Sequence, residues 1–121
     1  MYSIVLTKAA FLHRDYLIAF QRTIPSDVLA MIDNGRNGED IAMAHVVANR
    51  TKAAPVWVKV EAYETADSGI SSGGKKHFSD RGKVLHTLEK TTGSFPWVLG
   101  YQKAVPINYL DLFKLLWTHG K

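Results

Sequence analysis

Residues 37–44 read Asn-Gly-Glu-Asp-Ile-Ala-Met-Ala, an asparagine and two adjacent acids placed directly before an apolar run. This order is typical of a helix N-terminus, because Asn37 can cap the helix and Asp40, three residues later, can close a capping box. Glu39 and Asp40 would then lie at the positive end of the helix dipole. In this interpretation the two acids have a purely structural role. Only the surrounding sequence can indicate whether they also take part in a reaction.

Hydrophobic spacing predicts that helices and strands alternate along the chain. Helices are expected at residues 12–22, 25–33, 39–48 and 79–90, and strands at residues 3–6, 56–60 and 95–101. The first helix is expected to carry Leu12, Tyr16, Leu17 and Phe20 on one apolar face, and the third to be well buried. Residues 66–78, rich in Gly and Ser, are expected to form a loop. The alternation predicts an α/β domain.

The composition is that of one small globular domain. The chain has 121 residues, of which 46% are hydrophobic and 21% charged. No apolar run approaches the roughly 20 residues that span a membrane, and Lys8 interrupts the only apolar stretch near the N-terminus. The net charge of +4 and the pI of about 9.4 suit anionic ligands such as nucleotide diphosphates, acidic glycans or nucleic acid, without choosing among them.

Further sequence blocks occur on both sides of residues 37–44. Residues 2–11 read YSIVLTKAAF, residues 68–71 read SGIS, and His77, Arg81 and the run Val-Leu-His at 84–86 follow. In order and rough spacing these blocks resemble the exostosin-type glycosyltransferases of family 64. That family carries Asn-Cys-(Asp/Glu)-Asp-Ile-Ala-Met-Asn at the central block and Tyr-Ser-Met-Val-Leu-Thr-Gly-Ala-Ala-Phe upstream. The resemblance covers about residues 2–106 and leaves out the tail, 107–121, where a divergent terminal helix is expected to dock on the domain or to contact a membrane or partner.

The resemblance implies a fold and a set of site residues. The chain would be a single partial domain, the C-terminal, acceptor-side portion of a GT-A-like nucleotide-sugar transferase with a mixed sheet flanked by helices. In the family the second acid is regarded as catalytic and the acid before it contacts the donor sugar, which carries over to Asp40 and Glu39. The family's arginine lies near the donor diphosphate, which carries over to Arg81. His77 also has a family counterpart and is expected to bind substrate.

The residues themselves leave a plainer alternative open for each site. A carboxylate at a helix N-terminus is fixed in place where a substrate can approach, yet Asp40 could equally be part of a cap. Residues 75–83 gather four fixed positive charges, and an arginine there could fork onto phosphate oxygens. The same residues could also form a solvated basic loop.

The implied reaction is the retaining transfer of an N-acetylhexosamine from a UDP-sugar to a glycan acceptor. The family binds its donor and Mn²⁺ through an Asp-x-Asp motif in an N-terminal half, and this sequence contains no Asp-x-Asp. We therefore expect the chain to be inactive alone, with Mn²⁺ needed only by the complete domain and no metal ligand in this chain. The alternative is a non-catalytic remnant that binds carbohydrate or phosphate. A nucleic-acid-binding domain is disfavoured, because Trp57 and Trp97 are not interleaved with basic residues.

Departures from the family pattern carry further expectations. The chain has no cysteine, and Gly38 and Val84 stand where the family has two cysteines that are expected to bridge. Gly38 and Val84 should therefore be neighbours in space. Lys8 replaces a family glycine and Ala44 a family asparagine. Family members are anchored with their catalytic domain in the ER or Golgi lumen, but these residues contain no anchor, and the missing cysteines weaken the expectation of an oxidising compartment.

Overall fold

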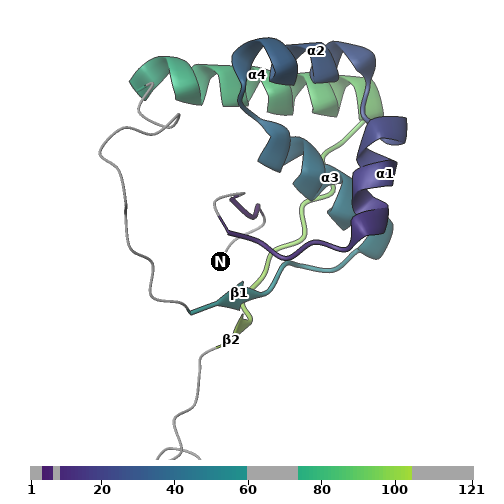
Figure 1. The fold of residues 1–121 in the computed structure, drawn as a ribbon, viewed down its shortest axis with the longest axis vertical. Helices are drawn as coiled ribbons and strands as arrows, with labels where there is room; N and C mark the ends of the chain where they lie inside the picture. The colour runs from purple at the N-terminus through teal and green to yellow at the C-terminus, as the bar shows by residue number, and fades with distance from the viewer. Residues whose placement is uncertain (1–3, 7–8, 60–73, 105–121) are drawn as a thin grey trace, which may run out of the picture.

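The computed structural model describes residues 4–6, 9–59 and 74–104, which form a layer of helices above a short sheet (Figure 1). The elements follow the chain as α1 (Arg14–Thr23), α2 (Ser26–Gly35), α3 (Glu39–Thr51), β1 (Trp57–Val58), α4 (Gly74–Thr92) and β2 (Lys103–Ala104). β1 and β2 pair in parallel, with Trp57 opposite Lys103 and Val58 opposite Ala104. The fold is dominated by helices and is compatible with the predicted α/β class.

Helix α3 lies at the centre of the packing. It contacts α1 and α4, and α2 packs in turn on α4. The prediction that α3 is well buried is confirmed, since six of its residues are buried. Among the described residues, one cluster of nine buried apolar side chains forms the core, namely Ala19, Ile24, Val28, Ile41, Ala42, Val46, Val84, Leu88 and Phe95. This core fixes the beginning of α3 against the middle of α4.

The expected capping box at the start of α3 is wrong. The N-cap is Gly38, whose backbone has a φ of 93°, and no side chain caps the helix. Asp40 instead accepts a hydrogen bond from the Ile41 backbone N–H at 2.8 Å. Asn37 lies one residue before the N-cap, and its side-chain NH2 donates to a backbone carbonyl of α4, 40 residues further along the chain.

The apolar face predicted for the first helix is only partly correct. Ala19 is its buried residue and Phe20 packs against the core, whereas Leu12 and Leu17 are 41% and 55% exposed. The small side chain of Ala19 is buried and Phe20 is half-buried against the core, while Leu17 of α1 lies to the outside. The hydrophobic pattern predicted the helix but not the face of α1 that packs on α3.

Two of the expected strands are not strands in the structure. Residues 4–6 have no regular structure, and residues 95–101 are irregular up to a single bridge at Gly100. Phe95 is buried among the helices, and its ring lies 4.6 Å from that of Trp97. Side-chain packing on the helical core, rather than a strand ladder, therefore holds this segment until β2. The strand expected at 56–60 is reduced to β1, with residue 60 outside the described part.

Helix α4 begins earlier than predicted. Residues 74–78, expected in a loop, form its first turns, while residues 66–73 of that loop and the tail at 107–121 lie outside the described residues. Lys76 and Asp80 form an (i, i+4) ion pair at 2.9 Å, the spacing that supports a helix. The early start of α4 places His77 beside the residues that precede α3.

We expect Gly38→Ala to destabilise the fold. A Cβ on Gly38 would lie 2.9 Å from Val84 Cγ2, and the φ of 93° is unfavourable for any residue with a side chain. The strain and the overpacking together should cost about 2–4 kcal/mol. The control is Gly82→Ala within α4, where a Cβ meets nothing within 4 Å and should stabilise by about 0.5–1 kcal/mol. Urea unfolding of both variants tests this, and equal stabilities would contradict the close contact.

Candidate active site

The centre of the site is an ion pair between α3 and α4. Arg81 donates from both terminal nitrogens to Asp40, with Nη1 2.9 Å from Oδ1 and Nη2 2.8 Å from Oδ2. The Asp40 side chain is 3% exposed and that of Arg81 is 20% exposed. The structure thus brings together the two residues that the sequence singled out, although they are 41 positions apart.

The bidentate geometry engages both oxygens of Asp40 but only part of the Arg81 guanidinium. Asp40 Oδ1 also accepts a hydrogen bond from the Ile41 N–H, so the carboxylate accepts two hydrogen bonds from Arg81 and one from Ile41. A guanidinium has five N–H donors in a planar fork, and two of those on Arg81 are directed at Asp40. The other three N–H groups lie on different edges of the guanidinium plane, and the Arg81 side chain is 20% exposed. Arg81 can therefore hold the Asp40 carboxylate while some of its other N–H groups meet a second anion.

Asn37 adds a second connection between the same two elements. Its side-chain amide donates to the backbone carbonyl of His77 at 2.8 Å, and the residue is 5% exposed. His77 lies one helical turn before Arg81 on α4. This hydrogen bond and the ion pair together fix the first half of α4 against the beginning of α3.

The other two predicted site residues lie beside the ion pair. Glu39 is exposed in the first turn of α3, next to Asp40. His77 is half-buried, and its ring meets that of Phe78 edge to face at 5.9 Å. All four predicted residues therefore lie where the start of α3 meets the first half of α4.

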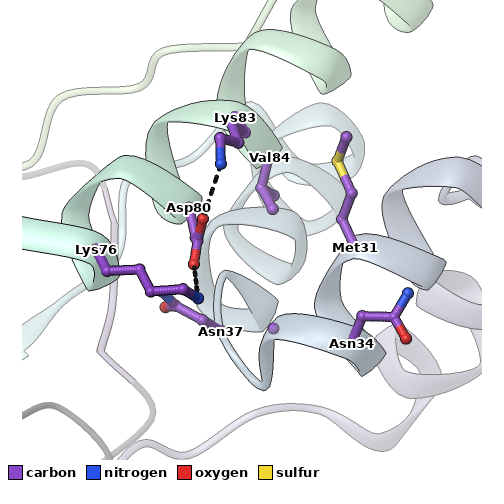
Figure 2. A pocket seen from close by; sticks show the side chains of 8 residues that line it. Met31, Asn34, Asn37, Lys76, Asp80, Lys83 and Val84 are labelled. Carbon is purple, nitrogen blue, oxygen red and sulfur yellow. Dashed lines mark hydrogen bonds and ion pairs between the residues drawn. The ribbon is translucent and has the colours of Figure 1, made fainter. Parts of the chain in front are cut away.

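The lysines of residues 75–83 do not join Arg81. Lys76 and Lys83 both donate to Asp80, at 2.9 and 3.0 Å. These hydrogen bonds lower the pKa of Asp80 below its usual value. Figure 2 shows both lysines meeting Asp80 beside a hollow of about 310 Å³ between α2 and α4. Asn37 and Val84 line the hollow but Asp40 and Arg81 do not, so Asp80 and its lysines form a separate group of charges next to the ion pair.

The expected proximity of Gly38 and Val84 is confirmed. A Cβ placed on Gly38 would lie 3.2 Å from Val84 Cβ, close to the roughly 3.5–4.5 Å found across disulfides. Gly38 precedes α3 and Val84 is a buried residue of α4. The two positions at which the resemblance implies a bridge thus meet in space, and they do so directly beside the Asp40–Arg81 pair.

Comparison with known proteins gives the family of the chain. The sequence matches the glycosyl transferase family 64 domain over residues 1–109. The chain belongs to family 64. It is similar to glycosylinositol phosphorylceramide mannosyl transferase 1 of Arabidopsis thaliana, with 39% identity over 104 residues, covering 86% of this chain and 31% of that protein.

Exostosins are also among the relatives of this family 64 chain. Exostosin-1b of Danio rerio is 31% identical over 121 residues, covering 95% of the chain, and exostosin-2 of Mus musculus is 33% identical over 116 residues, covering 92%. The match accounts for 16% of each exostosin. The chain therefore spans about a third or less of the length of these relatives.

The described residues show no metal centre and no membrane span. Within residues 4–6, 9–59 and 74–104, no three His, Cys, Asp or Glu side chains are grouped so that they could hold a metal ion. The described residues thus offer no site that fits Mn²⁺. None of the helices in this part of the chain combines the length and hydrophobicity that crossing a membrane requires.

Sequence reasoning missed the role of Asn37. It assigned Asn37 to a local helix cap, because an asparagine before an acidic first turn usually has that function. The actual acceptor, the His77 carbonyl, is a backbone atom 40 residues away, and no local pattern identifies such a partner. The family motif does contain this asparagine, which is the one signal that could have pointed to a non-local role.

Proposed function

We propose that this family 64 chain supplies the catalytic carboxylate and the leaving-group cation of a retaining glycosyltransferase. The reaction is transfer of a sugar, an N-acetylhexosamine, from a UDP-sugar to a glycan acceptor. The observation that carries the proposal is the bidentate hydrogen bonding of Arg81 to the buried Asp40 carboxylate. A negative and a positive group are thereby held side by side on two helices.

This arrangement matches the charges that develop during glycosyl transfer. As the bond to the diphosphate breaks, positive charge develops on the sugar near its anomeric carbon and negative charge on the leaving oxygen. Asp40 stabilises the sugar, and the remaining N–H groups of Arg81 stabilise the diphosphate. Because hydrogen bonds already fix both groups, little reorganisation is needed when the charges appear.

The neighbouring residues complete the proposed roles. Glu39 lies one residue before Asp40 and contacts the donor sugar. His77 lies one turn before Arg81 and contacts substrate on the same side of α4. Asn37 holds the His77 backbone at 2.8 Å, which keeps this turn of α4 in register with α3. The four predicted site residues, Glu39, Asp40, His77 and Arg81, together form the part of the site at which donor and acceptor meet.

The larger context is part of the same proposal. We infer that the chain is the acceptor-side portion of a GT-A-like domain. The ligands of Mn²⁺ and most contacts with the sugar donor would come from residues outside this portion. The complete protein would work in the lumen of the ER or Golgi. One relative is named for mannosyl transfer, so the donor assay should include mannose donors alongside UDP-N-acetylhexosamines.

A graft tests the proposed function. Residues 2–106 would replace the matching segment of the Arabidopsis mannosyl transferase, and sugar transfer would be measured for the graft, for the parent enzyme and for the 121-residue chain alone. We expect transfer by the graft, because the site is complete on its side of the domain, and no transfer by the chain alone. A folded but inactive graft would favour a non-catalytic binding remnant, and Mn²⁺-dependent transfer by the chain alone would contradict the partial domain.

A further inference from the structure

His45 is a buried imidazole that the proposed reaction does not use. It lies on α3 and is 6% exposed. Its Nδ1 atom is buried and has no hydrogen-bond partner among the described residues. A buried polar nitrogen without a partner has lost its hydrogen bond to water without forming one inside the protein, which is unusual in a folded core.

The imidazole packs on the segment that leads from α4 to β2. Its ring meets the Phe95 ring edge to face at 5.3 Å, and Phe95 in turn contacts Trp97 with ring centres 4.6 Å apart. Phe95 is 5% exposed. Figure 1 shows this segment running back past α3 towards β2. The three rings therefore connect α3 to the stretch that positions the second strand.

The charges around His45 disfavour a second positive charge there. Burial lowers the pKa of His45, and the nearby Lys52 ammonium at the end of α3 lowers that pKa further. The charged residues of α1, namely Arg14, Asp15 and Arg22, are exposed. On α4 the half-buried charged residues are Asp80, Arg81 and Glu89. Asp80 pairs with lysines, and Arg81 pairs with Asp40. Phe95 and Trp97 carry no charge, and the attraction of an imidazolium to one ring offsets only part of the loss of water.

We propose that the contact between His45 and Phe95 is a pH-sensitive connection, which opens when His45 takes up a proton and releases the segment between α4 and β2. The proton would bind to Nδ1, the ring nitrogen without a hydrogen-bond partner, or Nδ1 would become exposed to water. A protonated imidazole cannot remain without a partner in this apolar setting. This inference concerns the fold itself and does not depend on the transferase activity.

The direction of the effect follows from linkage. The pKa of His45 is lower in the folded chain than in the unfolded chain, where it is near the ordinary value of 6.5. The unfolded chain therefore binds the proton more readily once the pH falls below about 6.5, and the stability due to neutral His45 is present above that pH and lost below it. One proton taken up on unfolding raises the unfolding equilibrium constant by up to about tenfold per pH unit.

The test is unfolding of the full chain between pH 7.5 and 5.5, a range that ends above the titration of most carboxyl groups. His45→Phe keeps a ring against Phe95 but cannot titrate, and His86→Gln removes an exposed histidine of α4 as the matched control. We expect the unfolding constant of the wild type and of His86→Gln to rise by several-fold to tenfold more than that of His45→Phe. An equal pH dependence in all three proteins would overturn the proposal.

A second measurement, the titration of the imidazole groups, uses the wild-type chain alone. In the wild-type chain, the imidazole resonances of His45 and His86 can be followed by NMR as the pH falls. We expect His45 to titrate below the ordinary value of 6.5, with the Trp97 indole signal shifting in step with His45. Titration of His45 at or above 6.5, or a Trp97 signal that does not respond, would also overturn the proposal.

Discussion

Replacing Arg81 by alanine is expected to lower the free energy of unfolding by about 3–5 kcal/mol, the usual cost of leaving a buried charge without its partner. Asp40 is 3% exposed and would lose both of its hydrogen bonds from the guanidinium. The Ile41 N–H would remain as its one contact among those the structure shows. Because small domains are stable by only about 5–15 kcal/mol, this loss is a large part of the total.

Urea unfolding of the chain measures this effect, with Lys76→Ala as the control. Lys76 also pairs with a carboxylate at 2.9 Å, but its side chain is 83% exposed. Exposed pairs are worth at most about 1 kcal/mol, so Lys76→Ala should be nearly neutral. If Arg81→Ala were as mild as Lys76→Ala, the ion pair would contribute little to the fold.

Replacing Asp40 by asparagine in the grafted enzyme is expected to reduce transfer by about 10² or more, the range found for positioned charges and acid/base groups. Asparagine has nearly the same shape and still packs in the first turn of α3. It removes the negative charge that would face the sugar, and it presents an amide to one of the Arg81 N–H groups. The substitution therefore removes the chemistry while retaining most of the packing.

The control for this substitution is Asp80→Asn in the same graft. Asp80 is on α4 directly before Arg81, but it pairs with Lys76 and Lys83 and not with Arg81. Transfer by this variant should stay within a few-fold of that of the unsubstituted graft. Wild-type turnover in Asp40→Asn would reduce Asp40 to an anchor for α4, and a similar loss in both variants would point to a general effect of charge.

The sequence was most informative where one element sufficed. The order of residues 37–44 predicted that a helix begins at Glu39 and is well buried, and the structure confirms both. The proximity of Asp40 and Arg81 is a non-local fact that no spacing rule supplies. It was foreseen only because the resemblance placed both residues in one site, as it did for the adjacency of Gly38 and Val84.

The two errors have different physical causes. Gly73, Gly74 and several serines are typical of a loop, but the local ion pairs of Asp80 and the tertiary contact of Asn37 with the His77 carbonyl support helix from Gly74 onward. The apolar, aromatic residues at 95–101 predict a strand, but Phe95 is buried in the core that the helices form. A tertiary contact thus acts in both cases, and in α4 local ion pairs act with it.

The most direct test of the central claim is a neutral pair in the grafted enzyme, Asp40→Asn combined with Arg81→Gln. Two amides can hydrogen-bond to each other, and neither leaves a buried charge without a partner. We predict that the double variant is more stable to thermal unfolding than the grafted Arg81→Ala variant, while sugar transfer stays about 10² or more below that of the unsubstituted graft. Recovery of transfer together with stability would show that the pair holds the fold and takes no part in the reaction.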